Sequence, residues 1–472
     1  MNNLPPPGSR VHLIAVCGVG MASLAGLLSS LGYRVTGSDH NVYPPMSTYL
    51  EKIGIPILSG YHEQHLQPRP DLVVIGNAVS RSNPEASAVL DQGIPYISFP
   101  QALGQFLIGC RTSLVVTGTH GKTTTSALAA WVLTRAGLEP GFFIGGVPLN
   151  FGSGWHPGSG NYVVLEGDEY DSAFFDKGPK FLHYRPHHAI LTSVEFDHAD
   201  IYRDLDHLKD AFRRFVELIP TSGCLVACHD YLAVKEVVAA ARCRLVYYGN
   251  EDAADWTVKS VEIREGRSLF EPFYRGRSDG FIEVPLIGRH NVQNALAVYA
   301  MARELGIDRQ KLRDGLATFA GIKRRQEIKG RVRGVLVMDD FAHHPTAVKE
   351  TLSAVREAYP GRRVWAIFEP RSNTSRRNIF EREFAHTLAL ADRIVVAGLY
   401  QPEKVPEPER LSTQKIVDTV NGAGLQRAVV IEKADAIASY VGNNTVAGDI
   451  VIVMSNGGFD GVQDKILQAL AG

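Results

Sequence analysis

The sequence predicts an α/β protein built from three successive units. Its length of 472 residues corresponds to about three domains at roughly 150 residues each. Short apolar stretches alternate with helix-like stretches along the chain, a pattern typical of parallel sheets covered by helices. The alternation starts afresh twice, at Ser113 and at Arg333. We therefore expect three α/β units in series.

The first unit opens with a strand, a glycine-rich turn and a helix in the stretch HLIAVCGVGMAS, residues 12–23. Further strands are predicted over residues 33–39, 71–76 and 94–98, with helical stretches between them. This order indicates a parallel sheet that ends near residues 104–111.

The second and third units show the same alternation. In the second unit, strands are predicted over residues 114–117, 162–166, 189–194 and 223–227, followed by a long helix over 290–303. In the third, strands are predicted from residue 333 and over 363–368, 393–397 and 450–454. The Pro- and Glu-rich stretch 401–410 is expected to be an exposed loop.

Composition excludes several classes of protein. A formal net charge of −1 gives no basic footprint for nucleic acid. Five scattered cysteines favour a reducing compartment over a disulfide framework. The apolar stretch 11–28 contains three glycines and has neither the charged start nor the cleavage site of a secretion signal. We expect a cytoplasmic protein that binds neither nucleic acid nor membrane.

A candidate phosphate-binding loop follows the strand at residues 114–117. The loop consists of Gly118, Thr119, His120, Gly121, Lys122, Thr123 and Thr124. Backbone N–H groups of such a turn bind anions at a helix N-terminus, the lysine reaches phosphate oxygens, and a threonine hydroxyl binds Mg²⁺. The strict pattern fails, because Val116 occupies the place of the usual first glycine. We do not expect a loop lysine to belong to the core.

Acidic residues end two strands of the same unit. Glu166 closes one strand and is followed by Asp168, Glu169 and Asp171; a second strand runs into Glu195, Asp197 and His198. Carboxyl ends of parallel strands meet at one edge of the sheet. Thr123, Glu166 and His198 are therefore the predicted Mg²⁺ ligands, although a solvated acidic loop is the simpler alternative.

Six stretches in order along the chain resemble the Mur ligases, the ATP-dependent amide-bond-forming enzymes of peptidoglycan synthesis. They are GTHGKTTT from Gly118, LEGDEYD from Leu165, EFDH from Glu195, GRHNVQNALA from Gly288, IKRRQE from Ile322 and DDFAHHP from Asp339. The resemblance implies an N-terminal Rossmann-like domain over residues 1–108, a central P-loop ATPase domain over 109–325 and a C-terminal Rossmann-like domain over 326–472. ATP and Mg²⁺ are the implied cofactors.

The resemblance also implies residue roles. Lys122 would hold the β- and γ-phosphates, Asn291 would lie near the adenine, Arg325 would contact phosphate and Asp340 the ribose. Lys122, Glu166, His198 and His343 are the candidate catalytic residues, the role of His343 being the least defined. The base that deprotonates the incoming amine stays open among Glu169, Asp171 and His343.

The start of the chain resembles the branch of the family that acts on UDP-N-acetylmuramate. Gly18, Gly20 and Asp39 are its candidate contacts with this sugar nucleotide. The stretch 166–186 resembles members of that branch that add a murein tripeptide, so the resemblance implies L-alanyl-γ-D-glutamyl-meso-diaminopimelate as the incoming amine, and L-alanine is the alternative. That tripeptide has three carboxylates, and we expect arginine to bind them because its guanidinium can donate two parallel hydrogen bonds to one carboxylate. The candidate contacts are Arg371 and Asn373, in the stretch FEPRSNTSRR at residues 368–377. Arg376 and Arg377 are equally compatible with a contact to the tripeptide and with a solvent-exposed position.

Two other classes of protein remain as alternatives. GVGMAS at residues 18–23, with Asp39 some way on, comes close to a dinucleotide-binding fingerprint of an oxidoreductase. However, Ser23 replaces the third glycine, and an oxidoreductase would give the candidate phosphate loop at residues 118–124 no function. A P-loop switch is the other alternative, but it does not account for the motif at Asp339.

Overall fold

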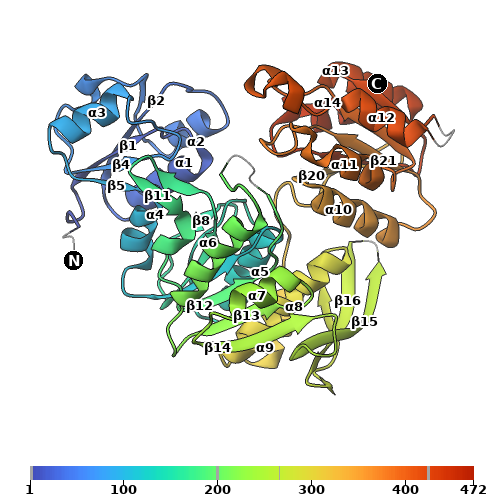
Figure 1. Cartoon of the computed structure of the whole chain (residues 1–472), viewed down its shortest axis with the longest axis horizontal. Coiled ribbons are helices and arrows are strands. Elements are labelled where there is room, and N and C mark those ends of the chain that lie inside the picture. Colours follow the sequence, from blue (N-terminus) through green and yellow to red (C-terminus); the bar gives the residue numbers. More distant parts are fainter. Residues whose placement is uncertain (1–3, 198–200, 265, 423–425) are drawn as a thin grey trace.

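The computed structural model describes residues 4–197, 201–264, 266–422 and 426–472. Figure 1 shows an N-terminal unit in blue and a C-terminal unit in red, both resting on a central unit in green and yellow. Each unit has its own main sheet, and the predicted α/β architecture is confirmed. None of the helices in the described part of the chain is long and apolar enough to cross a membrane.

The N-terminal sheet has the strand order β3-β2-β1-β4-β5, and all of its pairs are parallel. Its strands are β1 (Arg10–Ile14), β2 (Arg34–Asp39), β3 (Ile57–Ser59), β4 (Leu72–Ile75) and β5 (Tyr96–Ser98), and its helices are α1 (Val19–Ser30), α2 (Met46–Lys52), α3 (Pro84–Asp91) and α4 (Phe99–Ala102). The apolar stretch 11–28 forms β1, a turn and most of α1, with Leu13 and Leu24 in the core. The stretch 11–28 is therefore apolar because it is buried in the core of the N-terminal unit.

The central sheet is parallel through β15-β14-β13-β12-β6-β9-β7, and antiparallel strands extend it beyond β15 and beyond β7. Its strands are β6 (Thr112–Thr117), β7 (Gly141–Phe143), β8 (Trp155–His156), β9 (Tyr162–Gly167), β12 (His188–Leu191), β13 (Cys224–Cys228), β14 (Arg244–Gly249), β15 (Trp256–Arg264), β16 (Arg267–Tyr274), β17 (Arg277–Ser278) and β18 (Ile282–Val284). Its helices are α5 (Lys122–Arg135), α6 (Leu205–Glu217), α7 (Leu232–Val238), α8 (Arg289–Glu304) and α9 (Arg309–Ala317). Neighbouring residues of β6 enter opposite cores, Val115 on one face and Val116 on the other.

The register of the parallel strands decides where the functional loops lie. Leu114 of β6 pairs with Val164 of β9 on one side and with His188 of β12 on the other. The carboxyl ends of the three strands therefore lie together, and the loops that follow them gather at one edge of the sheet. Those loops contain the candidate phosphate loop and the two acidic stretches predicted from the sequence.

The C-terminal sheet has the order β19-β20-β24-β21-β22-β23, in which only β19 is antiparallel. Its strands are β19 (Glu327–Val332), β20 (Val335–Asp340), β21 (Val364–Phe368), β22 (Arg393–Ala397), β23 (Ala428–Ile431) and β24 (Ile450–Met454). Its helices are α10 (Pro345–Ala358), α11 (Glu381–Leu388), α12 (Thr413–Asn421), α13 (Ala434–Asn444) and α14 (Val462–Ala471). The stretch 401–410 is mostly exposed, as predicted, and holds two short 3₁₀ turns.

A hairpin of the central unit packs against the N-terminal unit. It consists of β10 (Asp171–Ala173) and β11 (Asp176–Pro179). Ser98 Oγ donates a hydrogen bond of 2.7 Å to Asp176 Oδ2, and the rings of Tyr96 and Phe175 meet edge to face. The hairpin lies within the stretch 166–186, so this stretch contributes to the contact between the two units.

Contacts between the C-terminal and central units include two hydroxyl–carboxylate hydrogen bonds, an ion pair of 2.8 Å between Arg289 and Glu357, and a linker. Thr346 donates to Glu195 at 2.8 Å, and Thr374 donates to Asp197 at 2.9 Å. In the linker, Arg324 and Gln326 both have left-handed backbone conformations, with φ of 60° and 52°. Asp340 Oδ2 accepts a hydrogen bond from the Gln326 amide at 2.8 Å, which fastens the linker to the C-terminal unit.

Candidate active site

The phosphate loop has a shape that requires glycine at two positions. Gly118 has φ of +130°, and a Cβ there would lie 2.2 Å from Thr192 Oγ1. Gly121 has φ of +81°, and a Cβ there would lie 2.6 Å from Asn294 Oδ1. The loop is held by hydrogen bonds from the amides of Thr119 and His120 to Ser193. Its backbone conformation is therefore set by close packing on the loop after β12 and on α8.

Lys122 begins α5 and is more buried than the sequence suggested. Its ammonium donates to Gly118 O at 2.6 Å and to both carboxylate oxygens of Glu169, at 2.9 and 3.1 Å. The side chain of Lys122 is 14% exposed and that of Glu169 only 1%. Burial alone would lower the pKa of Lys122, but the neighbouring Glu169 and Asp168 raise it above its usual value. Lys122 is thus a buried cation, contrary to the expectation for a loop lysine.

Oxygen donors suited to Mg²⁺ lie beside the loop. Thr123 Oγ1 donates to Glu166 Oε1 at 2.9 Å, and Glu166 Oε2 accepts from the Gly145 amide at 2.8 Å. A hydroxyl and a carboxylate are hard donors, which Mg²⁺ prefers together with phosphate and water oxygens. The donor set therefore fits the predicted ion. The third predicted ligand, His198, lies outside the described residues.

A cavity of about 440 Å³ opens beside the phosphate loop, and residues from the central unit, the linker and the C-terminal unit line it. Asn291, Arg325 and Asp340 all line this first cavity, as expected of residues around one nucleotide. Arg325 Nη2 donates to Thr123 Oγ1 at 3.3 Å. Asn291 donates a hydrogen bond of 3.1 Å to Gln326 Oε1. Gln326 also lines this cavity, and the sequence did not predict that because the position of Gln326 depends on the linker.

A second cavity of about 390 Å³ lies between the central and C-terminal units. Three cations, Arg371, Arg376 and Lys404, line it together with Asn373. The remaining lining residues include Tyr170, Asp197, His343, Ser372, Thr374, Tyr400, Gln401 and Asn456. The cavity is therefore suited to a ligand with several anionic groups. Lys404 was missed because it lies on the exposed loop after β22, where a lysine is usually only surface.

The structure separates the arginines of residues 368–377. Arg371 lines the second cavity, with its guanidinium carbon 3.6 Å from the ring centroid of Tyr400 and its Nη1 3.5 Å from Glu369 Oε1. Arg376 is 7% exposed and bonds to Asn373, so it also holds the loop in place. Arg377 pairs with Glu409 and does not line the second cavity.

Of the three candidate bases, His343 is the one that lines the second cavity. Its Nδ1 lies 2.9 Å from Phe341 O, and because a carbonyl only accepts, Nδ1 carries the hydrogen and Nε2 is left as a base. Burial lowers the pKa of His343, which keeps the ring neutral near pH 7. Glu169 instead binds Lys122, and Asp171 accepts hydrogen bonds from Lys177 and the Gly178 amide.

The candidate sugar-nucleotide residues gather at the start of α1. Gly18 is its N-cap, and Gly20 lies in its first turn. Asp39 accepts hydrogen bonds from the amides of Cys17 and Asn41, both at 2.9 Å, and is 6% exposed. Asp39 therefore shapes the glycine turn, while the amides at the helix start are placed as an anion site would need.

Comparison with known proteins gives matches along nearly the whole chain. The Mur ligase family catalytic domain matches residues 10–109, the Mur ligase middle domain 116–302 and the Mur ligase glutamate ligase domain 324–457. The UDP-N-acetylmuramate–L-alanyl-γ-D-glutamyl-meso-2,6-diaminoheptandioate ligase of Escherichia coli K12 is 41% identical over 98% of both chains. The UDP-N-acetylmuramate–L-alanine ligase of Carboxydothermus hydrogenoformans is 34% identical over 97% of this chain and 96% of that protein.

A solved structure extends the similarity to three dimensions. The murein peptide ligase of Psychrobacter arcticus superimposes with a TM-score of 0.72 and 37% identity, covering 98% of this chain and 99% of that chain. Full-length identity at these levels, with family domains matched in order, shows that this chain belongs to the Mur ligase family.

Proposed function

We propose that this ligase uses ATP to join L-alanyl-γ-D-glutamyl-meso-diaminopimelate to UDP-N-acetylmuramate in the cytoplasm, as part of peptidoglycan recycling. The observation that carries the choice of amine is the second cavity, with Arg371, Arg376 and Lys404 in its lining. Three cations match the three carboxylates of the tripeptide, whereas L-alanine has one. The 41% identity to a relative named for this tripeptide supports the same choice.

We assign the substrates to three domains: 1–108 for the sugar nucleotide, with Gly18, Gly20 and Asp39; 109–325 for ATP; and 326–472 for the amine. The lactyl carboxylate attacks the γ-phosphorus of ATP, which gives an acyl phosphate and ADP. Lys122 and Arg325 offset the repulsion between the two anions. Thr123, Glu166 and His198 would hold Mg²⁺, which would neutralise further phosphate charge.

The amine of the tripeptide then attacks the acyl carbonyl, and phosphate leaves. His343 is placed to accept the proton of the incoming ammonium at Nε2, because it lines the second cavity and its buried ring is neutral. Thr346 lines the first cavity, whereas His343 and Asp197 line the second, so residues 343–346 run from the amine cavity to the nucleotide cavity. We assign the acyl phosphate to this region.

Replacing Glu166 by glutamine is expected to raise the Mg²⁺ concentration needed for half-maximal rate. The amide keeps the shape of the side chain but loses the charge that draws the ion. Measuring rate against Mg²⁺ at saturating substrates checks this, with Asp168→Asn as control, since Asp168 binds Lys180 at 2.7 Å. Equal Mg²⁺ dependence in Glu166→Gln and the parent protein would contradict the assignment.

The test of the proposed function is ADP release with ATP, UDP-N-acetylmuramate and a panel of amines. We expect a higher kcat/KM with the tripeptide than with L-alanine, because only the tripeptide engages all three cations. A higher kcat/KM with L-alanine would identify the alternative, an L-alanine-adding ligase. ADP release with no amine requirement would reject ligation altogether.

A further inference from the structure

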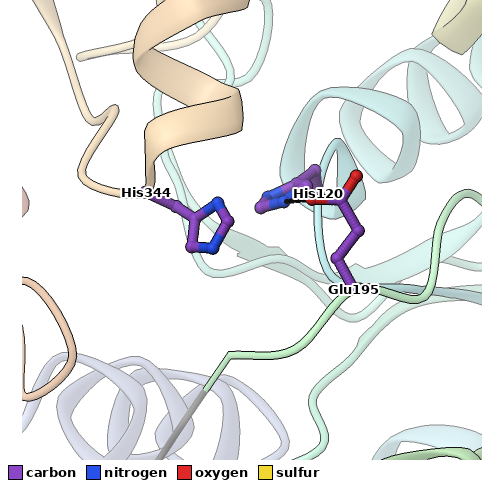
Figure 2. Close-up of side chains that lie close together, drawn as sticks. All are labelled: His120, Glu195 and His344. Carbon is purple, nitrogen blue, oxygen red and sulfur yellow. Dashed lines mark hydrogen bonds and ion pairs between the residues drawn. The ribbon is translucent and has the colours of Figure 1, made fainter. Parts of the chain in front are cut away.

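His120, Glu195 and His344 form a cluster at the contact between the central and C-terminal units. His120 belongs to the phosphate loop, Glu195 follows β12, and His344 stands at the start of α10; the two imidazole rings lie near each other with the carboxylate of Glu195 beside His120 (Figure 2). His120 Nε2 lies 3.1 Å from Glu195 Oε2. One donor atom from each of the three residues lies within 4.8 Å of the others.

An unsatisfied nitrogen points to a missing ligand. His344 is 7% exposed, and its Nε2 is buried without a hydrogen-bond partner among the described residues. Leaving a buried polar group unpaired costs about 1–3 kcal/mol, so such atoms are uncommon unless something binds them. The other ring nitrogen, Nδ1, accepts a 3.3 Å hydrogen bond from the Thr346 amide.

The rest of the cluster is held in place before any ion arrives. The backbone of Glu195 is fastened to the phosphate loop, since its amide donates to Thr119 Oγ1 at 2.9 Å and its carbonyl accepts from that hydroxyl at 3.1 Å. Glu195 Oε2 also accepts from Thr346 Oγ1 at 2.8 Å. Two donors are thus fixed to the central unit, and the third comes from the C-terminal unit.

The donor types select a class of ion. Two imidazoles and one carboxylate suit Zn²⁺ and related transition metals, whereas Mg²⁺ takes oxygen donors. Tetrahedral Zn²⁺ with bonds of about 2.0–2.1 Å places its ligands roughly 3.4 Å apart. The cluster therefore needs only small side-chain shifts to close around an ion, with water in the fourth position.

We propose that His120, Glu195 and His344 form a Zn²⁺-type transition-metal site that bridges the central and C-terminal units. None of these three residues belongs to the set assigned to Mg²⁺, which is Thr123, Glu166 and His198. Binding through His344 Nε2 moves the ring hydrogen to Nδ1 and gives up the contact with Thr346, at a cost of about 1 kcal/mol for a lost helix cap. A metal bond to the unpaired nitrogen outweighs that loss.

Titration of nucleotide-free, full-length protein with Zn²⁺, in excess Mg²⁺, tests the proposal by calorimetry. We expect one Zn²⁺ per chain at this site. His344→Asn keeps a good helix-capping side chain but removes the metal donor, and Glu195→Gln keeps the shape but removes the charge. Each should weaken binding at least about 10- to 100-fold, the loss known for outer-shell partners alone.

Three control variants address other Zn²⁺-binding groups. His290→Asn removes a ring 3.6 Å from Glu350 in the first cavity, His62→Asn removes an exposed histidine of the N-terminal unit, and Cys110→Ser removes an exposed thiol. All three should bind Zn²⁺ like the parent protein.

The proposal is overturned if the parent protein binds no stoichiometric Zn²⁺, if only one of His344→Asn and Glu195→Gln weakens binding, or if a control variant abolishes it. A visible spectrum of four-coordinate Co²⁺ in the parent protein, lost in His344→Asn, would add direct support for the geometry. None of these measurements depends on the proposed amine or on turnover, so the two proposals fail separately.

Discussion

Replacing Lys122 by methionine is expected to slow ligation by at least about a hundredfold, the usual effect of losing one electrostatic stabiliser of a transition state. The structure adds a second effect on stability. Glu169 is 1% exposed and binds the ammonium through both oxygens. Removing one partner of a buried ion pair costs about 3–5 kcal/mol. Lys122→Met should therefore also lower the melting temperature.

A double variant separates the two effects. Lys122→Met with Glu169→Gln removes both charges, so it should recover much of the lost stability, because neutral replacements of a buried ion pair are tolerated. Its turnover should remain as low as that of the single variant. Thermal melts and ADP release, measured on the same preparations, check this. Recovery of turnover in the double variant would show that the ammonium acts on Glu169 and not on phosphate.

The second large effect is expected at Arg371. Arg371→Ala should raise the KM for the tripeptide roughly 30- to 150-fold, because a charge-assisted contact with a carboxylate contributes about 2–3 kcal/mol. The KM values for ATP and for UDP-N-acetylmuramate should stay unchanged, since neither substrate is assigned to the second cavity. Steady-state kinetics with each substrate varied in turn gives the comparison.

Arg377→Ala is the matched control, because Arg377 belongs to the same stretch but pairs with Glu409 away from the second cavity. It should leave the tripeptide KM within about twofold, as expected of a surface ion pair contributing under 1 kcal/mol. An equal rise in both variants would mean that the loop as a whole, and not Arg371, sets the affinity.

The sequence predicted parallel strands in each of the three sheets because buried strands leave continuous apolar runs, as in β6, β21 and β24, but it missed the parallel strands β3, β7, β14 and β23. It also missed β15, which is parallel to β14, and the antiparallel strands that follow β15 in the central sheet. Strand β15 has mostly exposed or half-buried residues after Thr257, so no apolar run marks it. The hairpin of β10 and β11 was missed for a similar reason, since polar residues such as Asp171 and Lys177 dominate its surface.

The residues of the candidate active site also differ in how far the sequence could predict them. Lys122, Thr123 and Glu166 could be found because a phosphate loop and a strand-end acid are local patterns. The pairing of Lys122 with Glu169 and the approach of His344 to His120 depend on packing between distant segments. No local spacing encodes such contacts, and a single sequence gives no other signal for them.

The linker between the central and C-terminal units has a consequence for wasteful hydrolysis of ATP. Arg324 pairs with Asp339 and donates hydrogen bonds to two carbonyls after β24. The amide of Gln326 donates to Asp340. Both neighbours of Arg325 in the chain are therefore bound to the C-terminal unit. An outward swing of that unit would therefore pull on the backbone at Arg325 and is expected to draw its guanidinium away from the phosphate loop. An open enzyme holding only ATP then lacks one positive charge beside the γ-phosphate, and transfer to bulk water is disfavoured until the C-terminal unit docks.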